Sequence, residues 1–148
     1  MTRKTVGVVI QETTVSSSTE SVTIQQPATG AVRQISLRKV QVSPATDVMV
    51  EIRRDGTAAT ATSITPGKTD ASFDTPTAKA YRASDVGSGT LVDKFPAFGG
   101  AESAREFDRE VMLPAENTTS KNFTVKVTSP SGGSFSGDVR IRIVWDEF

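Results

Sequence analysis

The chain has 148 residues, and its 17 Lys and Arg balance its 17 Asp and Glu, so its formal net charge is zero. This balance argues against a dedicated nucleic-acid-binding protein, because such proteins normally carry a basic excess that neutralises phosphates. The sequence contains no Cys and no His, which excludes disulfides, thiolate nucleophiles, Ser-His-Asp relays and metal sites built on Cys or His.

One domain covering residues 1–148 is expected, because a chain of this length buries a real core without dividing. The N-terminus has a basic start but only a short apolar patch, which predicts no signal peptide. No run approaches the roughly 20 apolar residues of a membrane span. We therefore expect neither a membrane nor nucleic acid among the partners, and we expect residues 1–5 to form a flexible arm.

The first third of the chain alternates between apolar and polar stretches. Residues 6–10 predict a first strand, in which Gly7 indicates a bulge or close packing. Residues 11–20 are polar and rich in Ser, so we predict a loop or flexible arm there. Residues 21–25 alternate again and predict a second strand.

A long extended segment follows at residues 31–43, and its alternation changes phase. Ile35 and Leu37 share one parity, whereas Val40 and Val42 share the other. Side chains of a strand alternate with a period of two, so a regular strand would not switch in this way. We predict a bulge or bend between the two pairs, near Arg38 and Lys39.

Residues 48–54 give the second strongest strand pattern in the sequence. Asp55-Gly56 follows it directly, and this dipeptide is a strong hairpin signal. We therefore predict that residues 57–65 return as a strand beside residues 48–54.

Residues 68–100 have the least regular pattern in the chain. Short strands are predicted near 71–74 and 80–83, followed by a long loop. Residues 101–106 follow two glycines, and we predict one helical turn there. Residues 107–113 predict a strand, because Pro114 ends an apolar run.

The C-terminal segment carries the clearest pattern. Two alternating runs, 122–128 and 139–145, flank a connection rich in Ser, Gly and Pro, which predicts an antiparallel hairpin. The apolar parity of the two runs is expected in the core and consists of Phe123, Val125, Val127, Val139, Ile141, Ile143 and Trp145. The opposite parity carries Arg140, Arg142 and Lys126, which would form a basic stripe on the outer face of this hairpin.

Glu102, Glu106, Asp108 and Glu110 form the densest acidic cluster. Paired carboxylates serve as acid and base in glycoside hydrolysis. However, arginines interleave with these acids, which favours a solvated and charge-balanced surface. We predict no catalytic residue, no cofactor and no metal site, so each acid is expected to be replaceable without loss of activity.

Phe95 and Phe98 flank Pro96 in a predicted loop bounded by glycines. Aromatic side chains in loops are less easily explained by the core than those in strands. Together with Arg140 and Arg142, these two phenylalanines are therefore the candidates for a protein contact surface.

Frequent turn signals between short alternating runs are typical of a sandwich or barrel. Within this pattern, Val111-Met-Leu-Pro-Ala-Glu116 leads to Phe123-Thr-Val-Lys-Val127, a glycine-rich turn and the run 139–145. This order is similar to that of jelly-roll domains, and the chain resembles small β-sandwich structural proteins of tailed-phage virions, of the capsid decoration type. The resemblance implies an all-β antiparallel sandwich, jelly-roll-like, with long loops and at most one short helix.

The resemblance also implies a non-enzymatic subunit that stabilises a capsid after assembly in the host cytoplasm. Its partners would be the viral capsid or other virion proteins and its own copies, with a trimer favoured. The alternative is a carbohydrate-binding or receptor-binding module, which would need exposed aromatics, and Tyr81, Phe95 and Phe98 are the candidates. An enzyme is least favoured, because the chain has neither His nor Cys.

Overall fold

The computed structural model describes residues 5–84 and 88–148, and within them all regular structure is β. Sheet A contains β1 (Thr5–Ser18), β3 (Ile35–Pro44), β6 (Gly67–Lys68), β9 (Ser103–Glu106), β10 (Met112–Leu113) and β12 (Phe135–Glu147). Sheet B contains β2 (Glu20–Gln25), β4 (Val48–Arg54), β5 (Thr62–Ile64), β7 (Lys79–Ala83), β8 (Thr90–Ala97) and β11 (Asn122–Thr128). The described residues include no helix that is long and apolar enough to cross a membrane.

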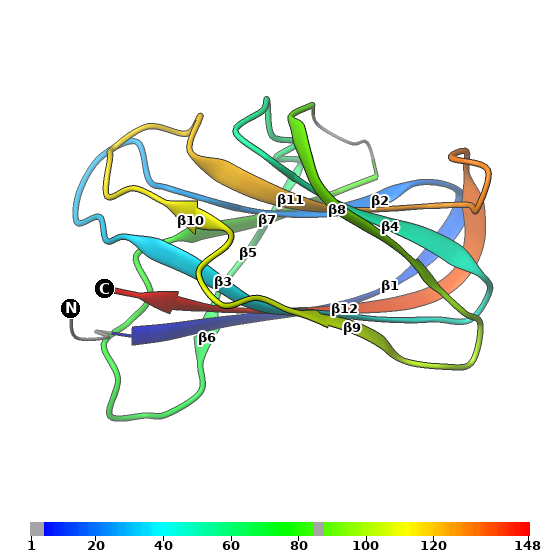
Figure 1. Cartoon of the computed structure of the whole chain (residues 1–148), viewed down its shortest axis with the longest axis horizontal. Coiled ribbons are helices and arrows are strands. Elements are labelled where there is room, and N and C mark those ends of the chain that lie inside the picture. Colours follow the sequence, from blue (N-terminus) through cyan, green and yellow to red (C-terminus); the bar gives the residue numbers. More distant parts are fainter. Residues whose placement is uncertain (1–4, 85–87) are drawn as a thin grey trace.

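The two antiparallel sheets pack face to face (Figure 1). Their strands run in the order β10-β3-β12-β1-β6 in sheet A, where β9 also pairs with β3, and β5-β7-β2-β11-β4-β8 in sheet B. The predicted antiparallel β-sandwich is therefore confirmed.

The strand pairs are nested along the sequence. The first and last strands, β1 and β12, pair in sheet A, and the next pair inward, β2 and β11, lies in sheet B. Continuing inward, β3 pairs with β9 and β10 in sheet A, and β4 pairs with β8 in sheet B. The chain is thus one long antiparallel ribbon that is rolled up, which is the topology of a jelly roll.

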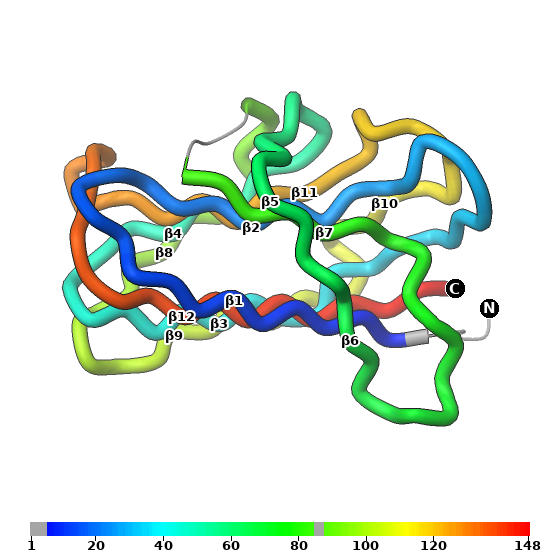
Figure 2. The backbone as a smooth tube through the Cα atoms, turned by 180° about the vertical axis from the view of Figure 1, so that it is seen from behind, coloured from blue at the N-terminus to red at the C-terminus, as the bar shows by residue number. Residues whose placement is uncertain are grey.

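The segment between β4 and β8 adds three strands outside this ribbon. β7 and β5 extend sheet B beyond β2, and β6 extends sheet A beyond β1. Figure 2 shows this segment passing from β5 in one layer to β6 in the other, at the side of the sandwich. It therefore links the two sheets at the side where β6 is the edge strand of sheet A and β5 is the edge strand of sheet B.

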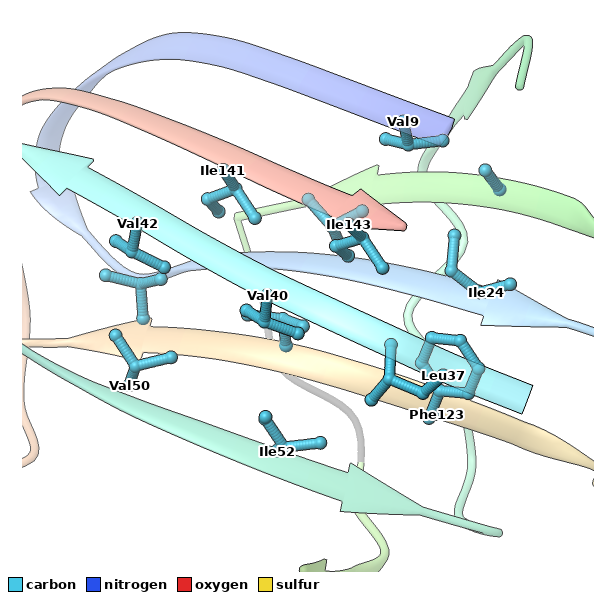
Figure 3. Close-up of a cluster of buried hydrophobic side chains, with 14 of the residues drawn as sticks. Val9, Ile24, Leu37, Val40, Val42, Val50, Ile52, Phe123, Ile141 and Ile143 are labelled. Carbon is cyan, nitrogen blue, oxygen red and sulfur yellow. The ribbon is translucent and has the colours of Figure 1, made fainter. Parts of the chain in front are cut away.

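The core lies between the facing sheets, where side chains of both inner faces meet (Figure 3). All seven residues predicted for the core by the C-terminal pattern are buried: Phe123, Val125, Val127, Val139, Ile141, Ile143 and Trp145. Trp145 is fully buried, and a Cβ atom added to Gly7 would overlap its indole ring. The predicted close packing at Gly7 is therefore confirmed.

The predicted C-terminal hairpin is wrong. β11 pairs with β2 and β4 in sheet B, whereas β12 pairs with β1 and β3 in sheet A. The connection 129–134 crosses from one sheet to the other, and six residues are long enough to span the about 10 Å between packed sheets. Alternation indicates a half-buried strand, but it does not identify the neighbouring strand.

The phase change in the third strand is confirmed as a bulge. Val144 pairs with Lys39 and Trp145 pairs with Leu37, so Arg38 has no opposite residue on β12. This extra residue lets both Leu37 and Val40 point into the core, where each is fully buried.

The expectation of a loop or arm at 11–20 is also wrong. β1 continues to Ser18 and β2 begins at Glu20. Pairing with β12 holds this polar stretch in an extended conformation, with a bulge between Val15 and Ser18. Residues 1–4 of the predicted arm lie outside the described residues, and Thr5 already belongs to β1.

Residues 57–65 do not return beside β4. Only Thr62–Ile64 is a strand, and it pairs with β7, at the edge of sheet B opposite β8. Asp55 adopts a positive φ of 56°, as the hairpin signal predicts. The chain nevertheless leaves β4 after this turn, because β11 and β8 already occupy both sides of this strand.

The middle of the chain is more regular than the sequence predicts. The strand expected at 80–83 is present as β7, and the strand expected at 71–74 is absent. Residues 90–97 of the predicted long loop form β8, and residues 103–106 of the predicted helical turn form the strand β9. Of residues 107–113, only Met112 and Leu113 form a strand. These strands are set by pairing with β3 and β4, which no local pattern reveals.

The inserted segment is anchored to the sandwich by a buried carboxylate. Glu147 is fully buried, and its Oε1 accepts hydrogen bonds from the backbone N and the Oγ1 of Thr77, both at 2.8 Å. Its Oε2 accepts one from Trp145 Nε1 at 2.9 Å, and Arg33 Nη1 lies 3.8 Å from Oε1. Buried charges are tolerated when they are paired and hydrogen-bonded in this way.

Glu147→Gln should lower the free energy of unfolding by about 2 kcal/mol, because the amide group replaces one acceptor with a donor and leaves a buried N–H unsatisfied. The matched control is Glu116→Gln at an exposed carboxylate, where the change should stay within about 0.5 kcal/mol. Urea unfolding followed by the fluorescence of Trp145 measures both. Equal stabilities of the two variants would contradict the anchoring role of Glu147.

Ile141→Asp should destabilise the fold by several kcal/mol, because it places an unpaired carboxylate in the core. Its neighbour Arg140 has a side chain that is 51% exposed, so Arg140→Asp should cost far less. Thermal unfolding monitored by circular dichroism distinguishes the two. A larger loss of stability for Arg140→Asp would show that the facing of β12 is inverted.

Candidate functional site

The structure separates the predicted basic stripe. Arg140 and Arg142 alternate with the core residues of β12, so they lie on the outer face of sheet A. Lys126 belongs to β11 and lies on the outer face of sheet B, on the opposite side of the molecule. The predicted stripe is therefore wrong as one surface, because β11 and β12 belong to different sheets.

An apolar strip lies on the outer face of sheet A, beside the two arginines. Val8 of β1 is opposite Val144 of β12, and Ile10 is opposite Arg142. Ile10 is 46% exposed, which makes it one of the most exposed large apolar side chains among the described residues. We call this surface, made of Val8, Ile10, Arg140, Arg142 and Val144, the sheet A face.

The cations of the sheet A face are paired. Arg140 Nε lies 3.0 Å from Glu12 Oε1. Arg142 Nη1 donates to Gln41 Oε1 at 3.0 Å, and Gln41 Nε2 donates to Glu102 Oε1 at 2.6 Å. These side-chain contacts form a row across the outer face of β1, β12 and β3 and end at Glu102, the residue before β9. The two arginines of the row are balanced by Glu12 and Glu102, so the face presents little unbalanced charge.

A further polar pair joins β3 and β12. Arg38 is the bulged residue of β3, and its Nη1 donates a hydrogen bond to Asp146 Oδ2 at 2.7 Å. The hydrogen bond to Asp146 and the negative charge of its carboxylate raise the pKa of Arg38. The bulge therefore has a second effect besides the burial of the core: it turns a guanidinium toward a carboxylate of the neighbouring strand.

The sheet A face is corrugated rather than deeply hollowed. Three open depressions of about 330, 220 and 410 Å³ follow one another along β12, and Arg142 lines the first two while Arg140 lines the last two. Depressions separated by side-chain ridges suit contact with another protein surface better than enclosure of a small ligand.

The acidic cluster does not converge on one point. Glu102 bonds to Gln41, Glu106 lies 4.0 Å from Lys39, and Asp108 donates its backbone N–H to the carboxylate of Glu110. In residues 5–84 and 88–148, no group of three or more acidic side chains is close enough to hold a metal ion.

Phe95 is not available for contact, which corrects its assignment as a candidate contact residue. It is 1% exposed and belongs to β8, where Phe95 and Ala97 face the core. Arg105 covers its ring, with the guanidinium carbon 4.6 Å from the ring centroid. Pro96 misled the sequence prediction, because proline is tolerated in an edge strand such as β8.

Phe98 lies just after β8 and is 58% exposed. It is therefore the second candidate surface feature, at one end of the sandwich rather than on a sheet face. The four predicted contact residues thus divide into a buried Phe95, an isolated Phe98, and a pair of arginines on the sheet A face.

The outer face of sheet B carries a charge cluster that the sequence did not reveal. The Glu51 carboxylate lies 3.2 Å from Arg53 Nε and 3.8 Å from the Nζ atoms of both Lys94 and Lys126. These cations come from β4, β8 and β11, which are distant in sequence and adjacent in the sheet. Only the pairing of those three strands brings them together.

Two opposing effects act on the pKa of Glu51. Burial by itself disfavours the charged carboxylate and raises its pKa. The hydrogen bond from Arg53 and the charges of Arg53, Lys126 and Lys94 outweigh burial, so the net pKa is lowered.

Neither a scan against models of protein families nor a search of curated proteins finds a match to this chain.

Glu51→Gln should reduce stability at neutral pH, because it leaves three neighbouring cations without their common anion. The pKa of Glu51 is lowered in the folded state, so its contribution is complete above the ordinary value of 4.5 and is lost as the pH falls through the lowered pKa. The difference in unfolding free energy between wild type and variant should therefore shrink on acidification. Chemical unfolding at several pH values measures it.

The exposed Glu116→Gln serves as the matched control, because it makes the same substitution away from these three cations. A difference between wild type and Glu51→Gln that stays constant down to the acid limit of folding would contradict the assigned pKa direction.

Proposed function

We propose that this chain is a non-enzymatic structural subunit of a virion, of the capsid decoration type, which binds a protein shell and its own copies. The jelly-roll topology supports the proposal by analogy, since this fold is common in viral capsid proteins. Viral localisation and assembly in the host cytoplasm belong to the same proposal.

The observation that carries the proposal is the sheet A face. Exposed Ile10 lies beside Val8 and Val144, and the surrounding cations are already paired with acids or amides of the same chain. An apolar centre with few unpaired charges is the composition of a protein interface. Docking of this face onto a shell would remove apolar area from water without stripping isolated charges.

Self-association is the second part of the proposal. The zero net charge gives little repulsion between copies. A closed homo-oligomer, with a trimer favoured, would present several sheet A faces at once. Several weak contacts then act together, and attachment becomes stronger than that of a single chain.

The alternative is a carbohydrate-binding or receptor-binding module, which jelly rolls also include. Its aromatic candidates do not form one stacking platform. Phe95 is buried, Tyr81 lies on β7, and Phe98 follows the edge strand β8 of sheet B. Four strand spacings, roughly 19 Å, separate these strands, so we rank the capsid proposal first.

Ile10→Lys should weaken binding to capsids that lack this protein by at least about tenfold, because it places a charge at the most exposed side chain of the apolar strip. Co-sedimentation of the purified chain with such capsids measures the affinity. Leu91→Lys is the matched control, since Leu91 and Ile10 are both 46% exposed and Leu91 lies on β8 of the other sheet.

Equal binding of Ile10→Lys and Leu91→Lys would exclude the sheet A face as the docking surface. A wild-type chain that ignores capsids but is retained on a polysaccharide column would favour the carbohydrate-binding alternative.

A further inference from the structure

An open depression lies on the outer face of sheet B, where two connections meet. One connection, 55–61, follows β4, and the other, 114–121, precedes β11. Both connections lie on the side of sheet B that faces away from sheet A (Figures 1 and 2). The depression has a volume of about 320 Å³, which falls at the lower end of the range for ligand sites, roughly 300–1,000 Å³. It is lined by Gln25, residues 56–58, Thr60, Thr119 and Ser120.

Gln25 is the buried member of this lining. It is the last residue of β2, and its alternation with the core residues Val22 and Ile24 places it on the outer face of sheet B. It is only 5% exposed, yet its carboxamide forms no hydrogen bond with any residue in the described parts of the chain. The adjacent Gln26 differs, because its Nε2 donates to two backbone carbonyls at 2.6 and 2.8 Å. The donors and the acceptor of Gln25 are therefore left for water or a ligand in the depression.

Hydrogen bonds hold the walls of the depression in place. Asn122 is 1% exposed, and its Nδ2 donates to Gly56 O at 2.8 Å and to Thr119 O at 2.9 Å, so it ties the two connections together. Thr57 O accepts a hydrogen bond from Ser88 N at 3.1 Å, and a Cβ atom at Gly56 would overlap the backbone of Ser88. A site whose walls are already fixed loses little conformational entropy when a ligand binds.

The lining of the depression is neutral and polar. Among the described residues that form it, none is charged, whereas sites for anions use Arg or Lys and sites for hard metal ions use carboxylates. None of these lining residues is an aromatic residue or an arginine either, and those are the residues that anchor protein interfaces. Its hydroxyl and carboxamide groups both donate and accept hydrogen bonds. A ligand that carries many hydroxyl groups, such as a saccharide, matches this lining.

The strand beside Gln25 adds an aromatic side chain to the same face. On β7, Lys79 is opposite Gln25 and Tyr81 is opposite Thr23. Alternation with the buried Ala80 places Tyr81 on the outer face. Tyr81 is thus the diagonal neighbour of Gln25, a position that aromatic and long side chains reach. Its ring offers a surface for the apolar side of a sugar ring.

Charged residues surround the depression without lining it. Asp55 precedes Gly56 and is paired with Arg54 Nε at 2.9 Å. Lys79 is exposed on β7, and Lys121 follows Ser120. The two lysines would attract an acidic sugar from the rim, so neutral and acidic saccharides have to be compared.

We propose that this depression binds one ring of a saccharide, with the carboxamide of Gln25 bonded to neighbouring hydroxyl groups and Tyr81 against the ring. The carboxamide presents a donor and an acceptor side by side, and two adjacent hydroxyl groups present the complementary pair. The site goes beyond the proposed function, because it lies on sheet B and its occupation does not involve the sheet A face. A subunit attached to a shell through sheet A would carry this saccharide site on its opposite side.

Nuclear magnetic resonance of the isotope-labelled chain tests the proposal. The side-chain amide signals of Gln25 are assigned by their loss in Gln25→Met. Neutral oligosaccharides of glucose, galactose, mannose and N-acetylglucosamine, and an oligosaccharide of galacturonate, are titrated into the millimolar range. At least one neutral saccharide should shift the Gln25 signals to saturation. Gln25→Met should weaken its binding at least about tenfold, as measured on the backbone amides of Thr57 and Ser120.

Thermal unfolding separates a binding role of Gln25 from a structural one. Because its carboxamide has no partner in the described chain, Gln25→Met should unfold at the wild-type temperature or above it. Gln11→Met makes the same substitution on β1 of the other sheet and should bind saccharide like the wild type. Tyr81→Leu is the second variant, and it should weaken binding while the chain stays folded.

The absence of any response to the neutral saccharides would overturn the proposal, as would equal binding by Gln25→Met and wild type. An unfolded or strongly destabilised Gln25→Met would also overturn it, because the carboxamide would then be structural. Binding of galacturonate alone, lost in salt and unchanged in Gln25→Met, would assign the effect to Lys79 and Lys121 instead. A response of the Gln25 signals to capsids but to no saccharide would assign the depression to protein contact.

Discussion

The pairing of β1 with β12 is the constraint on which the rest of this structure depends. It joins the two ends of the described chain over a register that runs from Thr5 opposite Glu147 to Ser18 opposite Phe135. Inside this outer pair, β2 pairs with β11 in the other sheet, and the remaining pairs nest inside them. Because these contacts are distant in sequence, the fold depends on long-range pairing, which is slow to form and cooperative once present.

Buried charge holds the inserted segment against this ribbon. Glu147 binds the backbone and side chain of Thr77, and fully buried Glu20 accepts two hydrogen bonds from Arg82, of 3.0 and 2.8 Å. Both acids come from the outer ribbon and both partners from the insertion between β4 and β8. Paired in this way, the carboxylates fix where β7 lies, whereas removal of one partner would leave a buried charge uncompensated.

The same roll creates three different surfaces. The outer face of sheet A combines an apolar strip with paired cations, whereas the outer face of sheet B gathers Arg53, Lys94 and Lys126 around one carboxylate. Exposed Phe98 lies just after β8, at one end of the sandwich. The presence of more than one such surface suits a subunit that contacts both a shell and its own copies, as we propose.

The sequence by itself determined the strands with strong alternation, the core side of β12, and the bulge at Arg38, because the period of two reports which side chains face inward. The tertiary structure decided which strands are neighbours. It placed β11 and β12 in opposite sheets, held the polar half of β1 extended, and buried Phe95 beneath Arg105. Pairing between distant strands leaves no local pattern in the sequence. The contacts of Glu51 with Lys94 and Lys126 are therefore seen only in the folded sheet.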